Sequence, residues 1–199
     1  MRTPGAAYYG VLPESCRRVL LAVARQEIAA ALTVGNPILP PRQPELETPC
    51  GAFVSLHLAG GRMRRLRGCI GVVHSDRPLY DTVRECACAA AYRDPRFPPL
   101  TSAELASVTI EISVLSPLER ITDIRLIEPG VHGILIEYGR HSGLLLPQVA
   151  KENRWTRSTF LEQTCRKAGL PPGAWADQGA ELCIFQAEVF DEATLRMGS

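Results

Sequence analysis

One order of elements, a strand hairpin followed by a helix, occurs twice in this chain. The second round starts after Ser116-Pro117, where the pattern of apolar residues begins again. In the first round the turn Ala59-Gly60-Gly61 joins two apolar strands, which is typical of a β-hairpin. The predicted segments are 52–58, 66–73 and 76–92 in the first round, and 132–138, 143–146 and 159–168 in the second. This order predicts a second unit that begins after Pro117 and ends before the last predicted strand.

Further segments complete the predicted fold. Residues 10–32 carry apolar side chains at three- and four-residue steps, which predicts a first helix. Residues 108–114 alternate apolar and polar side chains, which predicts a strand with one buried face. A last strand is predicted over residues 182–190, and proline-rich loops over residues 38–49 and 94–99.

The composition is that of a globular protein and excludes several classes of function. Hydrophobic residues make up 46% and charged residues 22% of the 199, which excludes a disordered or fibrous chain. A formal net charge of +1 gives no strong field to attract nucleic acid or an anionic membrane. The one basic cluster, residues 62–67, has no aromatic residue between its arginines to stack on bases. Nucleic-acid binding is therefore a distant third among the functions considered.

The cysteine pattern indicates a reducing compartment, and the apolar runs are too short to cross a membrane. No uncharged apolar run approaches the roughly 20 residues that span a bilayer, and the first helix does not resemble an export signal. The seven cysteines are odd in number and include no C-x-x-C pair, a pattern typical of free thiols. We therefore expect a cytoplasmic protein with reduced cysteines.

A short glycine-rich segment resembles the signature of a known family. Residues 66–71 read Leu-Arg-Gly-Cys-Ile-Gly, which is similar to the signature hexapeptide of the AMMECR-type domain. This domain also occurs as protein A of the AmmeMemoRadiSam system. Five further segments resemble the family's other marks in the same order, namely 94–100, 110–115, 132–133, 145–150 and 167–170. The first helix carries no mark that matches the family.

The resemblance implies an α+β fold of two unequal lobes, each with an antiparallel sheet flanked by helices, and a cleft between the lobes. It also suggests partners. The larger lobe is expected to hold residues 8–120 and 181–199, and the smaller lobe residues 121–180. Family members occur beside a Memo-like protein and a radical-SAM enzyme, which suggests a shared modification pathway. We therefore expect the protein to bind a protein or metabolite in the cleft within such a pathway. The alternative is a non-catalytic protein-interaction module.

The candidate site lies around the hexapeptide. In a strand, Arg67, Cys69 and Gly71 project to one face, and a nearby guanidinium favours the nucleophilic form of a thiol. Gly68 and Gly71 carry no side chains and would let a ligand approach closely. The alternative is a small buried cysteine with glycines that serve only packing. The other ligand-binding residues predicted from the family's marks are Arg96, His132 and Gln148.

Catalysis by Cys69 would need a base that takes the thiol proton, and His132 of the smaller lobe is the predicted partner. We expect Arg67 to face the cleft and therefore to add little to stability. No H-E-x-x-H or similar pattern occurs, so no metal site is expected, and the sequence identifies no cofactor. The residues leave both an enzyme and a binding protein open.

Overall fold

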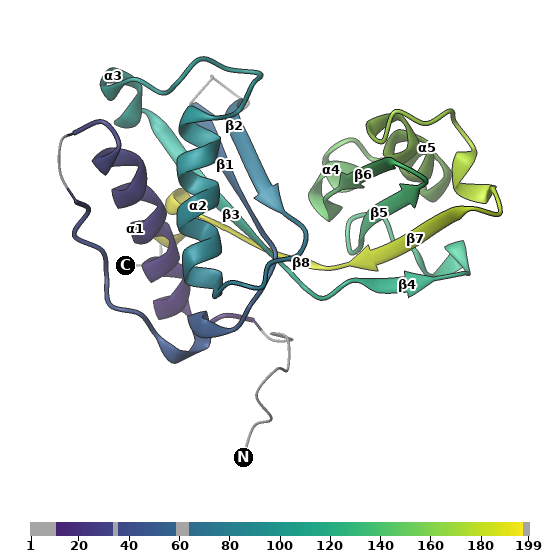
Figure 1. Cartoon of the computed structure of the whole chain (residues 1–199), viewed down its shortest axis with the longest axis horizontal. Coiled ribbons are helices and arrows are strands. Elements are labelled where there is room, and N and C mark those ends of the chain that lie inside the picture. The colour runs from purple at the N-terminus through teal and green to yellow at the C-terminus, as the bar shows by residue number, and fades with distance from the viewer. Residues whose placement is uncertain (1–10, 34–35, 59–63, 197–199) are drawn as a thin grey trace. The chain divides into compact units, whose positions relative to one another are not determined.

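The computed structural model describes residues 11–33, 36–58 and 64–196, and these form two compact units. The first unit contains the chain up to Leu115 and again from Glu188, and the second contains Ser116–Ala187. Each unit has a four-stranded sheet with helices beside it (Figure 1). The predicted α+β class with two antiparallel sheets is confirmed.

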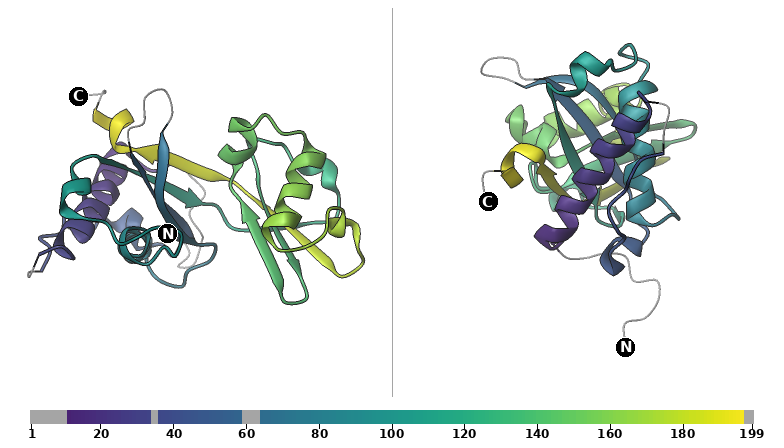
Figure 2. Two further views of the ribbon diagram at one scale, coloured as in Figure 1. Left: turned by 90° about the horizontal axis from the view of Figure 1, so that it is seen from above. Right: turned by 90° about the vertical axis from the view of Figure 1, so that its left-hand side faces the viewer.

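In the first unit, two helices cover one face of a sheet with the strand order β2-β1-β3-β8 (Figures 1 and 2). Its strands are β1 (Ala52–Leu58), β2 (Arg65–Val72), β3 (Val108–Leu115) and β8 (Ala187–Asp191). Its helices are α1 (Glu14–Ala30), α2 (Leu79–Tyr92), α3 (Ser102–Leu105) and α6 (Glu192–Arg196), with a 3₁₀ turn at Pro44–Glu47. Alternate residues of β1 and β3 are buried beneath α1 and α2, as in the pairs Val54–Ile112 and Leu56–Ile110. Alternation therefore leaves Ser55 on the opposite face.

The second unit has its own sheet and its own core. The strand order is β4-β7-β5-β6, with β4 (Glu119–Ile121), β5 (Gly133–Tyr138), β6 (His141–Leu145) and β7 (Ala180–Phe185). The helices are α4 (Pro147–Glu152) and α5 (Arg157–Lys167), with 3₁₀ turns at Ile124–Leu126 and Ala174–Ala176. Phe160 and Cys165 of α5 are fully buried against the sheet residues Ile134 and Ile136. Helix α5 ends at Lys167, and Gly169 follows its C-cap Ala168 with a φ of +72°, which suits the left-handed turn after a helix.

The predicted last strand, residues 182–190, is wrong in its extent. The structure has two strands there, β7 in the second sheet and β8 in the first, with Gln186 between them. The second unit consequently runs over residues 116–187, whereas the sequence predicted a smaller lobe over residues 121–180. The short strand β4 also belongs to the second sheet.

Three smaller points complete the comparison with the predicted elements. The first helix begins at Glu14, directly after Pro13. The predicted turn Ala59-Gly60-Gly61 lies outside the described residues. Within the described part of the chain, no helix is both long and apolar enough to cross a membrane.

Candidate functional site

Cys69 lies on β2, which is an edge strand of the first sheet. It is paired with Ser55 of β1, whose hydroxyl donates a hydrogen bond to the Cys69 sulfur over 3.2 Å. Ser55 is buried, whereas Cys69 is half-buried. The hydroxyl therefore orients a partly accessible thiol on the face of the sheet opposite α1 and α2.

The main chain of Cys69 is clamped by two side chains from the loop after α2. The Asp94 carboxylate accepts a hydrogen bond from the Cys69 N–H (2.9 Å), and Arg96 Nη2 donates one to the Cys69 carbonyl (3.0 Å). Arg96 also binds Asp94 through Nε and Nη2, at 2.9 and 2.7 Å. The Arg96 hydrogen bonds, followed by the main-chain N–H groups of Cys69 and Arg96, hold the pKa of Asp94 well below its ordinary value although burial opposes this. Asp94 thus stays charged and keeps the loop on the strand.

Arg67 is buried and paired with another side chain. The expectation that it faces the cleft and adds little to stability is therefore wrong. The residue is only 6% exposed, and its guanidinium binds the Glu104 carboxylate through Nε (2.8 Å) and Nη2 (3.0 Å). The hydrogen bonds from Arg67 and from the Thr101 N–H lower the pKa of Glu104 to about 2. Glu104 and Thr101 in turn form the capping box of α3. Arg67 therefore anchors α3 to β2.

A register shift explains the position of Arg67. Leu56 pairs with Gly68, but the next residue of β1, His57, pairs with Leu66. Arg67 is thus the extra residue of a β-bulge, where the simple alternation of faces is interrupted.

Both glycines of the hexapeptide have neighbours from the protein itself. A Cβ atom on Gly68 would lie 2.1 Å from the carbonyl oxygen of Ala90, so this glycine lets α2 approach the strand. A Cβ atom on Gly71 would lie 2.2 Å from the ring of Phe53. Packing within the first unit is sufficient to explain both residues.

Two predicted site residues belong to the second unit. His132 precedes β5, and its Nδ1 accepts a hydrogen bond from the Glu128 N–H over 3.1 Å. Gln148 is half-buried in α4. Their predicted role in binding stays a prediction.

Sequence reasoning missed a polar cluster on the face that carries Ser55. His57 lies two residues further along β1, and its Nε2 is 3.8 Å from the Glu111 carboxylate. Arg64 binds Asp191 and lies 4.0 Å from Glu111. The strand alternation could have indicated His57 and Glu111, whereas Asp191 comes from the far end of the chain. Among the described residues of this unit no histidine contacts the Cys69 thiol.

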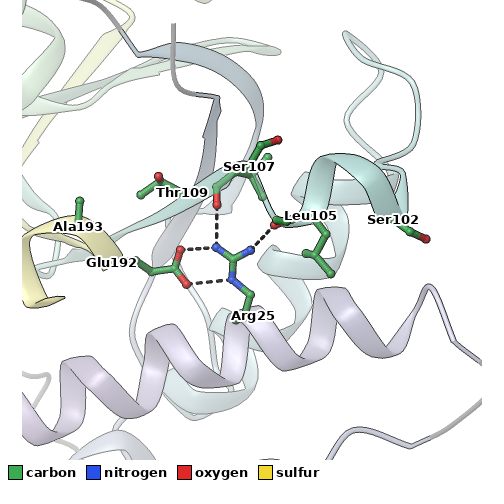
Figure 3. Close-up of a pocket in the computed structure, with 9 residues that line it drawn as sticks. Arg25, Ser102, Leu105, Ser107, Thr109, Glu192 and Ala193 are labelled. Carbon is green, nitrogen blue, oxygen red and sulfur yellow. Dashed lines mark hydrogen bonds and ion pairs between the residues drawn. The ribbon is translucent and has the colours of Figure 1, made fainter. Parts of the chain in front are cut away.

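A pocket of about 450 Å³ lies elsewhere in the first unit, beside Arg25, α3 and α6 (Figure 3). Arg25 binds Glu192 through Nε and Nη2 and donates to the carbonyl oxygens of Leu105 (2.7 Å) and Val108 (2.8 Å). The charge of this arginine is compensated inside the protein, so the pocket offers a ligand no unpaired cation. The described residues also include no group of three or more histidine, cysteine or acidic side chains that could hold a metal ion.

Comparison with known proteins extends the resemblance over most of the chain. A model of the AMMECR1 family matches residues 21–190. A protein of Thermococcus onnurineus is 44% identical over 182 residues, which cover 87% of this chain and 88% of the relative. Protein PH0010 of Pyrococcus horikoshii is 40% identical over 181 residues, with the same coverage of the two chains. The crystal structure of the uncharacterized protein PH0010 superposes with a TM-score of 0.81 and covers 87% of this chain and 89% of that one.

Proposed function

Because the chain belongs to the AMMECR1 family, we propose that it is a cytosolic binding protein that acts in a modification pathway with Memo-like and radical-SAM partners. We place the binding on the Cys69 surface, which we define as Cys69, Ser55, Asp94, Arg96 and Phe97. Its ligand is a protein or a large metabolite. A cytosolic location agrees with seven free cysteines, since reducing compartments keep thiols reduced.

One observation carries this proposal: a half-buried cysteine lies on a strand segment that two arginine–carboxylate pairs hold in place. Two arginine–carboxylate pairs, Arg96–Asp94 and Arg67–Glu104, hold the loop after α2 against β2. Side chains that only fill space need no such frame, whereas binding sites gain affinity when their groups are held in place beforehand. The Arg96 side chain is still 48% exposed, so the frame presents a cation to solvent.

The geometry favours binding over covalent catalysis by Cys69. A nucleophilic cysteine needs a base within hydrogen-bond reach. In the described part of the first unit the groups that reach the thiol are the Ser55 hydroxyl and the Arg96 guanidinium, and neither is a base. This observation supports a non-catalytic interaction module as the second candidate function. A catalytic and a non-catalytic role of Cys69 differ in one respect: a catalytic thiol cannot be replaced by serine without loss of turnover, whereas a binding surface tolerates the exchange.

A cross-linking experiment tests the proposal. Cys69 and Cys183 are both half-buried, but they belong to different units, so each serves as the control for the other. A thiol-reactive photo-cross-linker is attached to Cys69 in a variant with Cys88→Ala and Cys183→Ala, or to Cys183 in a variant with Cys69→Ala and Cys88→Ala. Each protein is then mixed with the purified Memo-like protein and radical-SAM enzyme of the same genome.

We expect cross-links from Cys69 and none from Cys183. We also expect Arg96→Gln to weaken the complex in isothermal titration calorimetry, while the exposed Arg140→Gln of the second unit has no effect. Equal cross-linking from both thiols, or a complex unchanged by Arg96→Gln, would contradict the proposed surface.

A further inference from the structure

We infer that the ligand of the Cys69 surface binds through a carboxylate, which accepts hydrogen bonds from Arg67 and Arg96. The Phe97 ring covers the Arg67 guanidinium in the free protein and turns aside when the carboxylate enters. This inference rests on the proposed function and specifies the chemistry of the ligand at the same surface.

The first argument is that one nitrogen of the Arg67 guanidinium lacks an acceptor. The side chain is more than nine-tenths buried, and its Nε and Nη2 bind the Glu104 carboxylate. Nη2 also donates to the Pro99 carbonyl oxygen over 3.4 Å. Nη1 is buried as well, yet among the described residues it has no hydrogen-bond partner. An unpaired buried donor on a charged group is unfavourable, so this position favours an acceptor that the chain itself does not supply.

A second arginine of the same unit shows that the fold can satisfy all three guanidinium nitrogens. Arg25 binds Glu192 through Nε and Nη2, which is also how Arg67 binds its carboxylate (Figure 3). Its Nη1 donates to the Leu105 carbonyl oxygen over 2.7 Å. Arg67 is the more buried of the two, with a side chain 7% exposed against 25%, but its Nη1 lacks such an acceptor. The missing acceptor is therefore particular to Arg67.

The second argument concerns Phe97, whose ring lies against both arginines of the site. Its centre is 5.9 Å from the guanidinium carbon of Arg67 and 5.5 Å from that of Arg96. Phe97 is half-buried, and the other residues of the segment 95–99 are exposed. Asp94 holds the start of this segment on β2 through the Cys69 N–H. Rotation of the Phe97 side chain therefore uncovers Arg67 without movement of the main chain that anchors the loop.

The third argument selects a carboxylate among the possible acceptors. Arg67 and Arg96 are each paired with one acidic side chain already, so the site has donors to spare but no surplus positive charge. A phosphate would bring close to two negative charges to these compensated pairs. An amide offers one acceptor oxygen without charge, and its hydrogen bonds to a guanidinium are weaker.

A carboxylate brings a single charge and two acceptor oxygens, and its hydrogen bonds with guanidinium groups are charge-assisted. One oxygen can accept from the buried Arg67. The other can accept from Arg96, because that side chain is 48% exposed and open to a ligand. The two arginines together therefore match the two oxygens of one carboxylate.

The test uses acetate, inorganic phosphate and acetamide as probes of the three acceptor classes. Each is titrated at constant ionic strength into the full chain labelled with ¹⁵N-arginine, so that screening by salt is the same throughout. NMR follows the Nε–Hε signals of Arg67 and Arg25, which are assigned through bonds. Arg25 is the internal control, because each of its guanidinium nitrogens has a partner within the protein.

We expect acetate to shift the Arg67 signal saturably and to leave the Arg25 signal in place. Acetamide should bind about tenfold more weakly, because it cannot form a charge-assisted hydrogen bond, and phosphate should also bind more weakly than acetate. Phe97→Ala should bind acetate about two- to fivefold more tightly, because the cation–π contacts no longer hold the ring over the guanidinium. Leu126→Ala, at an exposed apolar position of the second unit, should leave acetate binding unchanged.

Several outcomes overturn the inference: an Arg67 signal that ignores acetate, an equal response of Arg25, or binding of acetamide or phosphate as tight as that of acetate. Weaker acetate binding by Phe97→Ala would overturn the covering role of the ring. If these occur while the partner complex still depends on Arg96, the inference fails and the proposed function stands. If acetate binds at Arg67 but the partner complex ignores Arg96→Gln and cross-links equally from both thiols, the proposed function fails instead.

Discussion

In both edge strands, β2 and β6, a glycine lets a helix pack close to the sheet. The two strands differ in the charged side chains that lie along their edges. Each has a glycine where a helix lies against the sheet: a Cβ atom would lie 2.1 Å from the Ala90 carbonyl oxygen at Gly68, and 2.5 Å from the Ala168 main-chain nitrogen at Gly143. Close approach of a helix to an edge strand thus needs a glycine in either unit. At β2, however, the edge also carries the Asp94–Arg96 clamp and the Arg67–Glu104 pair.

This difference separates the part of the hexapeptide that builds the fold from the part available for function. Gly68 and Gly71 serve packing in the first unit, as Gly143 does in the second. Within the described part of the chain no residue of β6 takes part in an ion pair, so the charged frame around Cys69 has no counterpart there. We therefore assign the glycines to structure and the Cys69 surface to binding.

The largest expected change in the free energy of unfolding comes from substitution of the glycines, and it should be similar in the two edge strands. Gly68→Ala and Gly143→Ala each drive a Cβ atom into main-chain atoms that cannot move away, so each should destabilise the protein by about 3 kcal/mol. Ser142→Ala, at an exposed position on β6, is the control and should change the free energy of unfolding by less than about 0.5 kcal/mol. Urea denaturation measures all three. A tolerated Gly68→Ala would show that α2 does not pack as closely as the structure has it.

The second-largest loss of stability is expected from an arginine of the first unit and not from the matched arginine of the second. Arg67→Met removes a buried guanidinium and leaves Glu104 with only its α3 capping partners, which should cost about 2 kcal/mol because Glu104 is partly exposed and can regain water. Arg120→Met removes a pair with Glu181 that is exposed on both sides and should cost less than about 0.5 kcal/mol. The double variant Arg67→Met with Glu104→Gln should recover part of the loss. Equal melting temperatures for the two single variants would contradict a structural role for Arg67.

Local sequence patterns predicted the helices and strands. What they did not predict depends on contacts between residues that are far apart in the sequence. Alternation in residues 108–114 and helical spacing in residues 76–92 correspond to β3 and α2. The break at Gln186 carries no glycine or proline, so nothing local divides β7 from β8. The two strands separate because they pair with different sheets, which a single strand's pattern does not contain.

The sequence predicted Cys69 and Arg96 as site residues, but not the ion pairs that hold this segment in place. The family resemblance placed Cys69 and Arg96, which the structure brings together through the Cys69 carbonyl. The buried role of Arg67 depends on a bulge and on Glu104, a partner 37 residues away. The capping-box spacing of Thr101 and Glu104 is visible in the sequence, but the contact of Glu104 with β2 is not. The sequence likewise identifies Asp94 only as part of a proline-rich loop and of a family mark. Its hydrogen bond to Cys69 joins residues 25 positions apart, which no local pattern indicates.

Acid should cost the frame of β2 more stability than it costs the exposed pairs of the second unit. The pKa of Glu104 is lowered to about 2 by Arg67 and Thr101, and that of Asp94 is lowered mainly by Arg96. A lowered pKa in the folded state adds stability that is complete above the ordinary value of about 4.5 and is lost as the pH falls toward about 2. Glu104→Gln should flatten this part of the stability curve. Asp123→Asn should flatten it less, because Arg125 also lowers the pKa of Asp123 but water screens that pair. Chemical denaturation between pH 2 and pH 6 makes the comparison, and identical curves for wild type and Glu104→Gln would contradict it.

The smallest expected effect concerns the thiols. Cys69→Ser replaces a half-buried sulfur with a hydroxyl that the Ser55 hydroxyl can still meet, so the free energy of unfolding should fall by less than about 1 kcal/mol. Cys165→Ala is the contrasting change in the second unit, because its sulfur is fully buried and its removal leaves a cavity that should cost about 1–2 kcal/mol. Differential scanning calorimetry gives both values, and binding of the pathway partners is measured on the same samples. A Cys69→Ser variant that loses as much stability as Cys165→Ala, yet binds its partners as wild type does, would show that Cys69 is a packing residue. The binding role would then rest on Arg96 alone.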